Sequence, residues 1–101
     1  MRERLILLIT DSLRRVADER GLMLPAVLDD VTPLFGGDGV LDSLGLVALI
    51  VLCEQAVEDG LGVSVSLADE RALSQRRSPF ASIGSMADYV SARLQAEGWN
   101  G

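Results

Sequence analysis

An acid and a serine stand side by side in the middle of this 101-residue chain, directly before a strongly apolar segment. Residues 39–47 read Gly-Val-Leu-Asp-Ser-Leu-Gly-Leu-Val, and the apolar run continues to Cys53. Asp42 and Ser43 both suit the start of a helix, because their short side chains can accept hydrogen bonds from the unpaired N–H groups there. The sequence therefore predicts a helix that begins with an exposed serine hydroxyl. A phosphate attached to that hydroxyl would lie near the positive end of the helix dipole.

Missing residue types exclude several kinds of chemistry. The chain has no histidine, which excludes a Ser–His–Asp triad, a Cys–His pair and a histidine metal site. All nine basic residues are arginine, so neither a P-loop lysine nor a Schiff base can form. Cys53 is the single cysteine, which excludes an internal disulfide and fits a reducing compartment. A serine nucleophile would have only carboxylates as nearby bases, so an enzyme is the least favoured class.

Charge is distributed unevenly along the chain. The formal net charge is −6, which argues against nucleic acid as a partner. Residues 21–70 contain no base and nine acids: Asp29, Asp30, Asp38, Asp42, Glu54, Glu58, Asp59, Asp69 and Glu70. This block predicts a negative field around Ser43 that attracts basic partner surfaces. The alternative is an ordinary solvated acidic surface.

The chain shows no sign of a targeting segment or a membrane span. Residues 1–5 lack the apolar core of a signal peptide, and the longest apolar run, residues 46–53, is too short to cross a bilayer. We expect a cytoplasmic monomer without a membrane span.

Composition and periodicity predict an all-α fold in one domain, residues 1–101. Apolar residues make up 49% of the chain and only four residues are aromatic, which favours a small helical bundle. We expect helices at residues 1–20, 43–59 and 85–97, a short helix at 67–73, and a long loop at 21–42. The first helix has an apolar stripe of Leu5, Ile9, Leu13, Val16 and Ala17. The last helix has a stripe of Met86, Tyr89, Val90 and Leu94, with its start signal at Ser85.

The helix expected at 43–59 is apolar on most of its circumference. We expect its core face to contain Leu44, Val47 and Val51 with Ala48 and Leu52, which leaves over Leu46, Leu49, Ile50 and Cys53. Such a helix is either central in the bundle or uses part of its surface to dock partners or shelter a cargo chain. Central packing is favoured, and Cys53 is then a small buried hydrophobe. Five apolar residues should pin the long loop to the bundle: Val27, Leu28, Val31, Leu34 and Phe35.

The Asp-Ser-Leu sequence at residues 42–44, placed after a long loop at an acidic helix start, resembles the attachment motif of acyl carrier proteins. The order of expected helices is similar to the four-helix acyl carrier bundle over nearly the whole chain. The resemblance implies a protein that is not an enzyme and has no catalytic residue. A phosphopantetheinyl transferase would attach 4'-phosphopantetheine from coenzyme A to Ser43. The thiol of that arm would then carry an acyl or aminoacyl group as a thioester.

The resemblance also implies partners and recognition residues. The partners would be the transferase, an acyl- or aminoacyl-activating enzyme and downstream acyl-transfer enzymes. Recognition would fall on Asp42, Leu44, Leu46 and Val47, with Leu44 also anchoring the helix start and Asp42 adding to the negative surface.

Two departures from fatty-acid carriers favour a stand-alone carrier of a specialised pathway. Acids on this helix are delayed to Glu54, and Gly45 stands where a polar residue is frequent, as if a partner or the arm came close there. D-alanyl carriers share a similar pattern, and polyketide or peptide-synthetase carriers remain alternatives. A different class also remains open, namely a helical interaction module in which the apolar helix docks a partner and Ser43 only caps.

Overall fold

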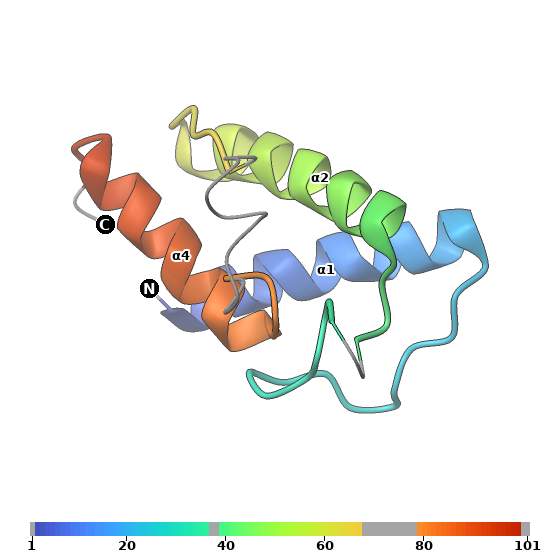
Figure 1. Ribbon diagram of the computed structural model, residues 1–101. Helices are drawn as coiled ribbons and strands as arrows, with labels where there is room; N and C mark the ends of the chain where they lie inside the picture. Colours follow the sequence, from blue (N-terminus) through green and yellow to red (C-terminus); the bar gives the residue numbers. More distant parts are fainter. Residues whose placement is uncertain (1, 37–38, 68–78, 100–101) are drawn as a thin grey trace.

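The computed structural model describes residues 2–36, 39–67 and 79–99 (Figure 1). These residues form three helices and no strand: α1 (Arg2–Arg20), α2 (Ser43–Leu61) and α4 (Ile83–Ala96). The expected all-α class is therefore confirmed. The short helix expected at 67–73 lies outside the described residues except for Leu67, which is not helical.

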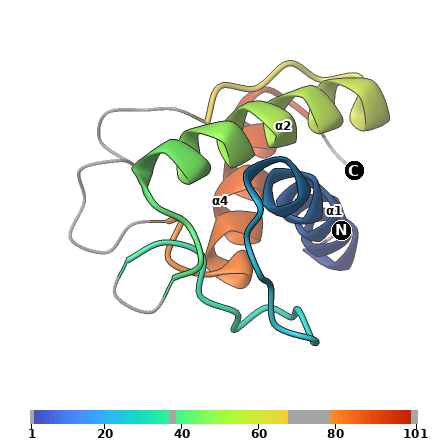
Figure 2. The same ribbon diagram turned by 90° about the vertical axis from the view of Figure 1, so that its right-hand side faces the viewer.

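The first helix is the support on which the other two pack. α1 contacts both α2 and α4, and Figure 2 looks nearly along its axis with α2 crossing above it. The predicted stripe of α1 is confirmed, because Leu5, Ile9, Leu13 and Val16 are fully buried and Ala17 is nearly so. Amphipathic spacing alone was enough to orient this helix.

The orientation of α2 is opposite to the one expected. Its buried residues are Gly45, Leu46, Leu49, Ile50, Cys53 and Val57. Leu44, Val47 and Val51, which were expected in the core, are 70%, 51% and 44% exposed. Ala48 and Leu52 do pack against the core, as expected, but the prediction was wrong for the other three residues. Both faces of this helix are apolar, so hydrophobicity does not distinguish them. Leu41, just before the helix, is also buried, and its side chain lies beside Gly45 on the buried face.

Residues 30–34 of the long loop pair with the start of α4. The backbone hydrogen bonds run from Leu34 N to Ala81 O (2.8 Å), from Ile83 N to Thr32 O (3.0 Å) and from Gly84 N to Asp30 O (2.8 Å). Leu34 is fully buried and Leu28 and Phe35 pack against the core, as predicted. The prediction was wrong for Val27 and Val31, which are more than 70% exposed. Backbone pairing and the other three apolar residues hold the loop instead.

Three helix ends differ from the predicted ones. α2 continues two residues past Asp59 to Leu61, which packs against the core, and Gly62 ends it in the left-handed conformation (φ 71°). α4 begins at Ile83 rather than Ser85 and ends at Ala96 rather than 97. The earlier start follows from the burial of Ile83 and from the use of Ser82 as the cap.

None of the helices in the described part of the chain is long and apolar enough to cross a membrane.

Candidate functional site at the start of α2

Asp42 is the N-cap of α2. Its backbone is extended (φ −85°, ψ −176°), and its Oδ1 accepts a hydrogen bond of 2.7 Å from the N–H of Gly45. This short, charge-assisted bond satisfies one of the N–H groups that the first turn leaves unpaired. The capping that sequence assigned equally to Asp42 and Ser43 therefore belongs to Asp42.

Ser43 is the first residue of α2, and its side chain is exposed. Since Asp42 supplies the cap, the Ser43 hydroxyl is not required to hold the helix start. No acidic side chain occupies the first turn of α2. The positive end of this helix is therefore balanced mainly by Asp42, and an anion attached to Ser43 would lie close to it.

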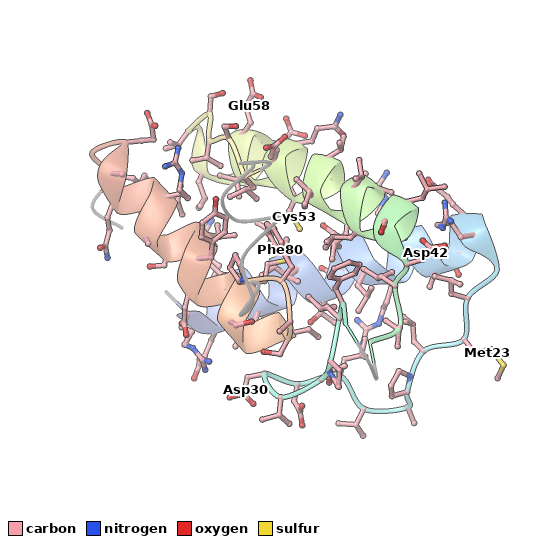
Figure 3. The ribbon with its side chains drawn as sticks, viewed as in Figure 1. Met23, Asp30, Asp42, Cys53, Glu58 and Phe80 are labelled. Atoms are coloured by element: carbon pink, nitrogen blue, oxygen red, sulfur yellow. The ribbon has the colours of Figure 1, made fainter. Side chains whose placement is uncertain are left out.

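The guanidinium of Arg20 reaches this helix start from the last residue of α1. Arg20 Nη2 lies 3.4 Å from both Oδ1 and Oδ2 of Asp42. Figure 3 shows Asp42 at the start of α2 beside the end of α1. One carboxylate thus caps α2 and also contacts the end of α1 across 22 residues of sequence.

A shallow hollow opens beside the serine. Its volume is about 200 Å³, and it is lined by Phe35, Ser43, Leu46 and Val47. Pockets that enclose drug-sized ligands measure about 300–1,000 Å³. This hollow is smaller and mainly apolar, so it suits a few apolar groups adjoining Ser43 better than a free ligand.

Exposed apolar side chains extend from the serine along α2. Leu44, Val47 and Val51 follow helical spacing and form what we call the apolar stripe. Leu46 is only 3% exposed, so of the four predicted recognition residues it is the least accessible to a partner. Leu44 is exposed and does not anchor the helix start as expected. That role falls to the buried Leu46 and Leu41.

Gly45 is buried against the chain's own residues. A Cβ at this position would lie 3.2 Å from both Asp42 Oδ1 and Leu41 Cδ2. The expectation that this glycine marks close approach by a partner or the arm is therefore replaced by an internal cause. The capping carboxylate and Leu41 leave little space for a side chain here.

The acids of α2 lie away from Ser43. Glu58 is near the opposite end of the helix from Asp42 (Figure 3). Glu54 is partly buried, and its Oε2 accepts a 2.6 Å hydrogen bond from Leu67 N. Asp42 is engaged by its two partners. On α2, the acidic groups left free by these contacts are therefore concentrated far from the serine.

Cys53 is not a second reactive site on α2. The thiol is fully buried in the core beside Ser12, and burial raises the pKa of Cys53 to about 12. The prediction that Cys53 behaves as a small buried hydrophobe is confirmed.

The sequence interpretation missed two residues of this site. Arg20 carried no signal, because nothing in its local sequence indicates that the end of α1 meets the start of α2. Phe35 was predicted only as an anchor for the loop, and yet it also lines the hollow. Both contacts arise from tertiary packing.

The arrangement suits a serine that is modified by another protein. Asp42 is the nearest carboxylate in sequence, and its hydrogen bond to Gly45 and ion pair with Arg20 leave it poorly placed as a general base. Comparisons with protein-family models, with curated proteins and with solved structures find no match for this chain.

Proposed function

We propose that this chain is an acyl or aminoacyl carrier that bears 4'-phosphopantetheine on Ser43. The observation that carries the proposal is the division of roles at the start of α2. Asp42 caps the helix through Gly45, and Ser43 is left exposed. A serine with no capping duty, on a fixed helix and beside an apolar surface, is well placed for covalent modification.

The proposed modification requires a transferase. The Ser43 oxygen attacks the phosphorus of coenzyme A that bears the pantetheine, and a new O–P bond forms. The bond to the second phosphate breaks and releases adenosine 3',5'-bisphosphate, while the hydroxyl proton passes to a base of the transferase. Coenzyme A and magnesium accompany the transferase, because the carrier supplies only the hydroxyl.

The surroundings of Ser43 support contact with several partners in turn. The apolar stripe offers a transferase, an acyl- or aminoacyl-activating enzyme and an acyl-transfer enzyme the same surface beside the modified residue. The hollow lined by Phe35 and Val47 could receive the first apolar groups of an arm. The proposal includes the full four-helix carrier bundle with a short helix at 67–73, acting as a cytoplasmic monomer in a specialised biosynthetic pathway.

Intact mass spectrometry tests this function. The purified chain is incubated with coenzyme A, magnesium and a promiscuous phosphopantetheinyl transferase. We expect the wild-type chain to gain one phosphopantetheine and Ser43→Ala to gain none. Ser64→Ala is the matched control, because it removes another exposed serine and should still be loaded. Failure of the folded wild-type chain to gain mass with several transferases would count against the carrier function.

The apolar stripe also supports the second candidate, an interaction module that never receives an arm. In that case Leu44, Val47 and Val51 would dock a partner without any need for the serine. Ser43→Ala separates the two functions. A carrier with this substitution stays folded but loses loading, whereas a docking module with the same substitution keeps its partner.

A further inference from the structure

We infer that Arg20 is the cation that binds the phosphate of a group esterified to Ser43. This inference deepens the proposed function, on which it rests, by naming the side chain that would hold the modified residue. Nothing in the sequence motif points to Arg20, which belongs to a different helix.

Arg20 already lies at the correct place. Its Nη2 is 3.4 Å from both carboxylate oxygens of Asp42, the residue directly before Ser43. Neighbouring Cα atoms are about 3.8 Å apart. A phosphate carried on the Ser43 oxygen would therefore lie one residue from the present partner of this long, flexible arginine side chain.

The present partner of Arg20 holds it only loosely. Charge-assisted hydrogen bonds between nitrogen and oxygen are typically about 2.7–2.9 Å long. Asp42 makes a bond of that length to Gly45 N, but its two contacts with Arg20 are 3.4 Å. The Asp42 carboxylate is thus held by its capping bond to Gly45, whereas the Arg20 guanidinium can leave it to bind an anion that interacts more strongly.

The local charge favours movement of Arg20 from Asp42 toward a phosphate on Ser43. With Ser43 unmodified, Asp42 and Arg20 together are neutral, and a phosphodiester adds one negative charge beside them. The sequence has no basic residue between positions 21 and 70. In the described part of the chain, the ion pair with Asp42 places Arg20 at this helix start. Arginine is also the side chain best suited to bind a phosphate with two parallel hydrogen bonds.

A purely structural role for Arg20 explains the geometry less well. The ion pair is solvent-exposed, with side-chain exposures of 35% and 68%, and exposed pairs contribute little to stability. The buried residues of α1 and α2, such as Val16 and Leu49, already hold these helices together. Arg20 is therefore available as a positioning residue for the group on Ser43.

The test places a phosphate on Ser43 without any transferase. Phosphoserine is incorporated at position 43 of the full chain, and phosphorus NMR follows its second ionisation, near pH 6 in unperturbed phosphoserine. The comparison includes Arg20→Gln, Arg20→Lys and the control Arg14→Gln. Arg14 is an exposed arginine of the same helix, paired with Asp11 at 3.5 Å.

We expect Arg20→Gln to raise the second pKa of the phosphoserine by roughly 0.2–0.7 unit, because a neighbouring cation favours the dianion. Arg20→Lys should recover much of the original value and Arg14→Gln should leave it unchanged. High salt should reduce the difference. Equal pKa values with and without Arg20, or equal shifts for Arg20→Gln and Arg14→Gln, would overturn the inference.

The same measurement keeps this inference separate from the proposed function. Failure of transferase loading would refute the carrier function, but the phosphoserine titration would still report on Arg20. If loading succeeds, the phosphodiester resonance of the loaded chain should also move in Arg20→Gln and not in Arg14→Gln. If the phosphodiester resonance has the same chemical shift in the wild type and in Arg20→Gln, the contact is limited to the phosphomonoester. That result would overturn the role of Arg20 in the carrier.

Discussion

The starts of α2 and α4 use serine in different ways. At α4, Ser82 Oγ accepts from Ser85 N at 3.1 Å, and Ser85 Oγ accepts from Ser82 N at 3.0 Å. Ser85 Oγ also donates to Pro79 O at 2.9 Å. At α2, Asp42 performs the same capping of the third residue, but that residue is Gly45, which has no side chain to reach back.

This difference separates a structural serine from a serine that is available for chemistry. Both serines at α4 are consumed by hydrogen bonds that hold the helix start, so modification of either would break the capping box. At α2 the acid performs the capping and Ser43 is left over. A serine beside a helix start is therefore a candidate for modification when another residue carries the cap.

Cys53, the second potential nucleophile on α2, differs from Ser43 because it is buried. Burial raises the pKa of this thiol from 9.0 to about 12, so at neutral pH the folded chain should hold about a thousand-fold less thiolate than the unfolded chain. Alkylation with iodoacetamide should be slow in buffer and fast in denaturant. Similar rates in both would show that Cys53 is accessible.

The same pKa shift predicts how stability depends on alkaline pH. Below about pH 9 the thiol is protonated in both states and its burial contributes fully. As the pH rises from 9 toward 12, the unfolded chain ionises first, so the free energy of unfolding should fall. Urea unfolding of the wild type and Cys53→Ala checks this, because the variant should lose that part of the pH slope.

Adding a methyl group at each helix start should reveal how tightly each is packed. In Gly84→Ala the new Cβ would lie 2.7 Å from the backbone oxygen of Asp30, and we expect a loss of about 1–3 kcal/mol. In Gly45→Ala the closest contacts are 3.2 Å, and the higher helix propensity of alanine offsets part of the strain. Urea unfolding should therefore rank Gly84→Ala as the more damaging change. The opposite order would contradict the packing described for these two starts.

Removing the serine hydroxyls should separate the two helix starts directly. Ser82→Ala removes a cap and should lower stability by about 1 kcal/mol. Ser43→Ala should change it by less than about 0.5 kcal/mol, because Asp42 retains the cap. Asp42→Ala is the positive control and should cost about 1 kcal/mol by the same argument. A loss in Ser43→Ala equal to that in Ser82→Ala would remove the distinction between them.

Substitutions in the apolar stripe should change the free energy of unfolding least. Val47→Ala truncates a side chain that is 51% exposed, so its unfolding free energy should change by less than about 0.5 kcal/mol. If partners dock here, the same variant should lower the kcat/KM of transferase loading severalfold. The exposed Val27→Ala, on the long loop, is the matched control and should leave loading unchanged.

Local sequence patterns predicted the orientation of a helix where one side of it is polar and the other is apolar. α1 was oriented correctly because charged residues gather on one side of the helix, and an apolar stripe that includes Leu5 and Leu13 lies on the other. α2 was oriented incorrectly because Leu44 and Leu49 are equally apolar, and only tertiary packing decides between them. The start of α4 was placed two residues late because Ser82 and Ser85 both suit a cap, and the burial of Ile83 is not visible in the sequence.

In the candidate site, too, some residues can be predicted from local sequence and others cannot. Ser43 and Asp42 were predicted from their types and adjacency at a helix start and from the resemblance of residues 42–44 to a known motif. Arg20, Phe35 and the internal reason for Gly45 depend on contacts between segments that are distant in sequence or on the packing of Leu41. No local pattern carries that information.

Site-localised mass spectrometry of the transferase-treated chain tests the central claim most directly. The wild-type chain is loaded, digested and fragmented to find which serine carries the phosphopantetheine. We predict that Ser43 alone is modified and that Ser82 and Ser85, held in their capping box, are not. An arm on Ser82 or Ser85, or no arm on any serine of the folded chain, would contradict the account.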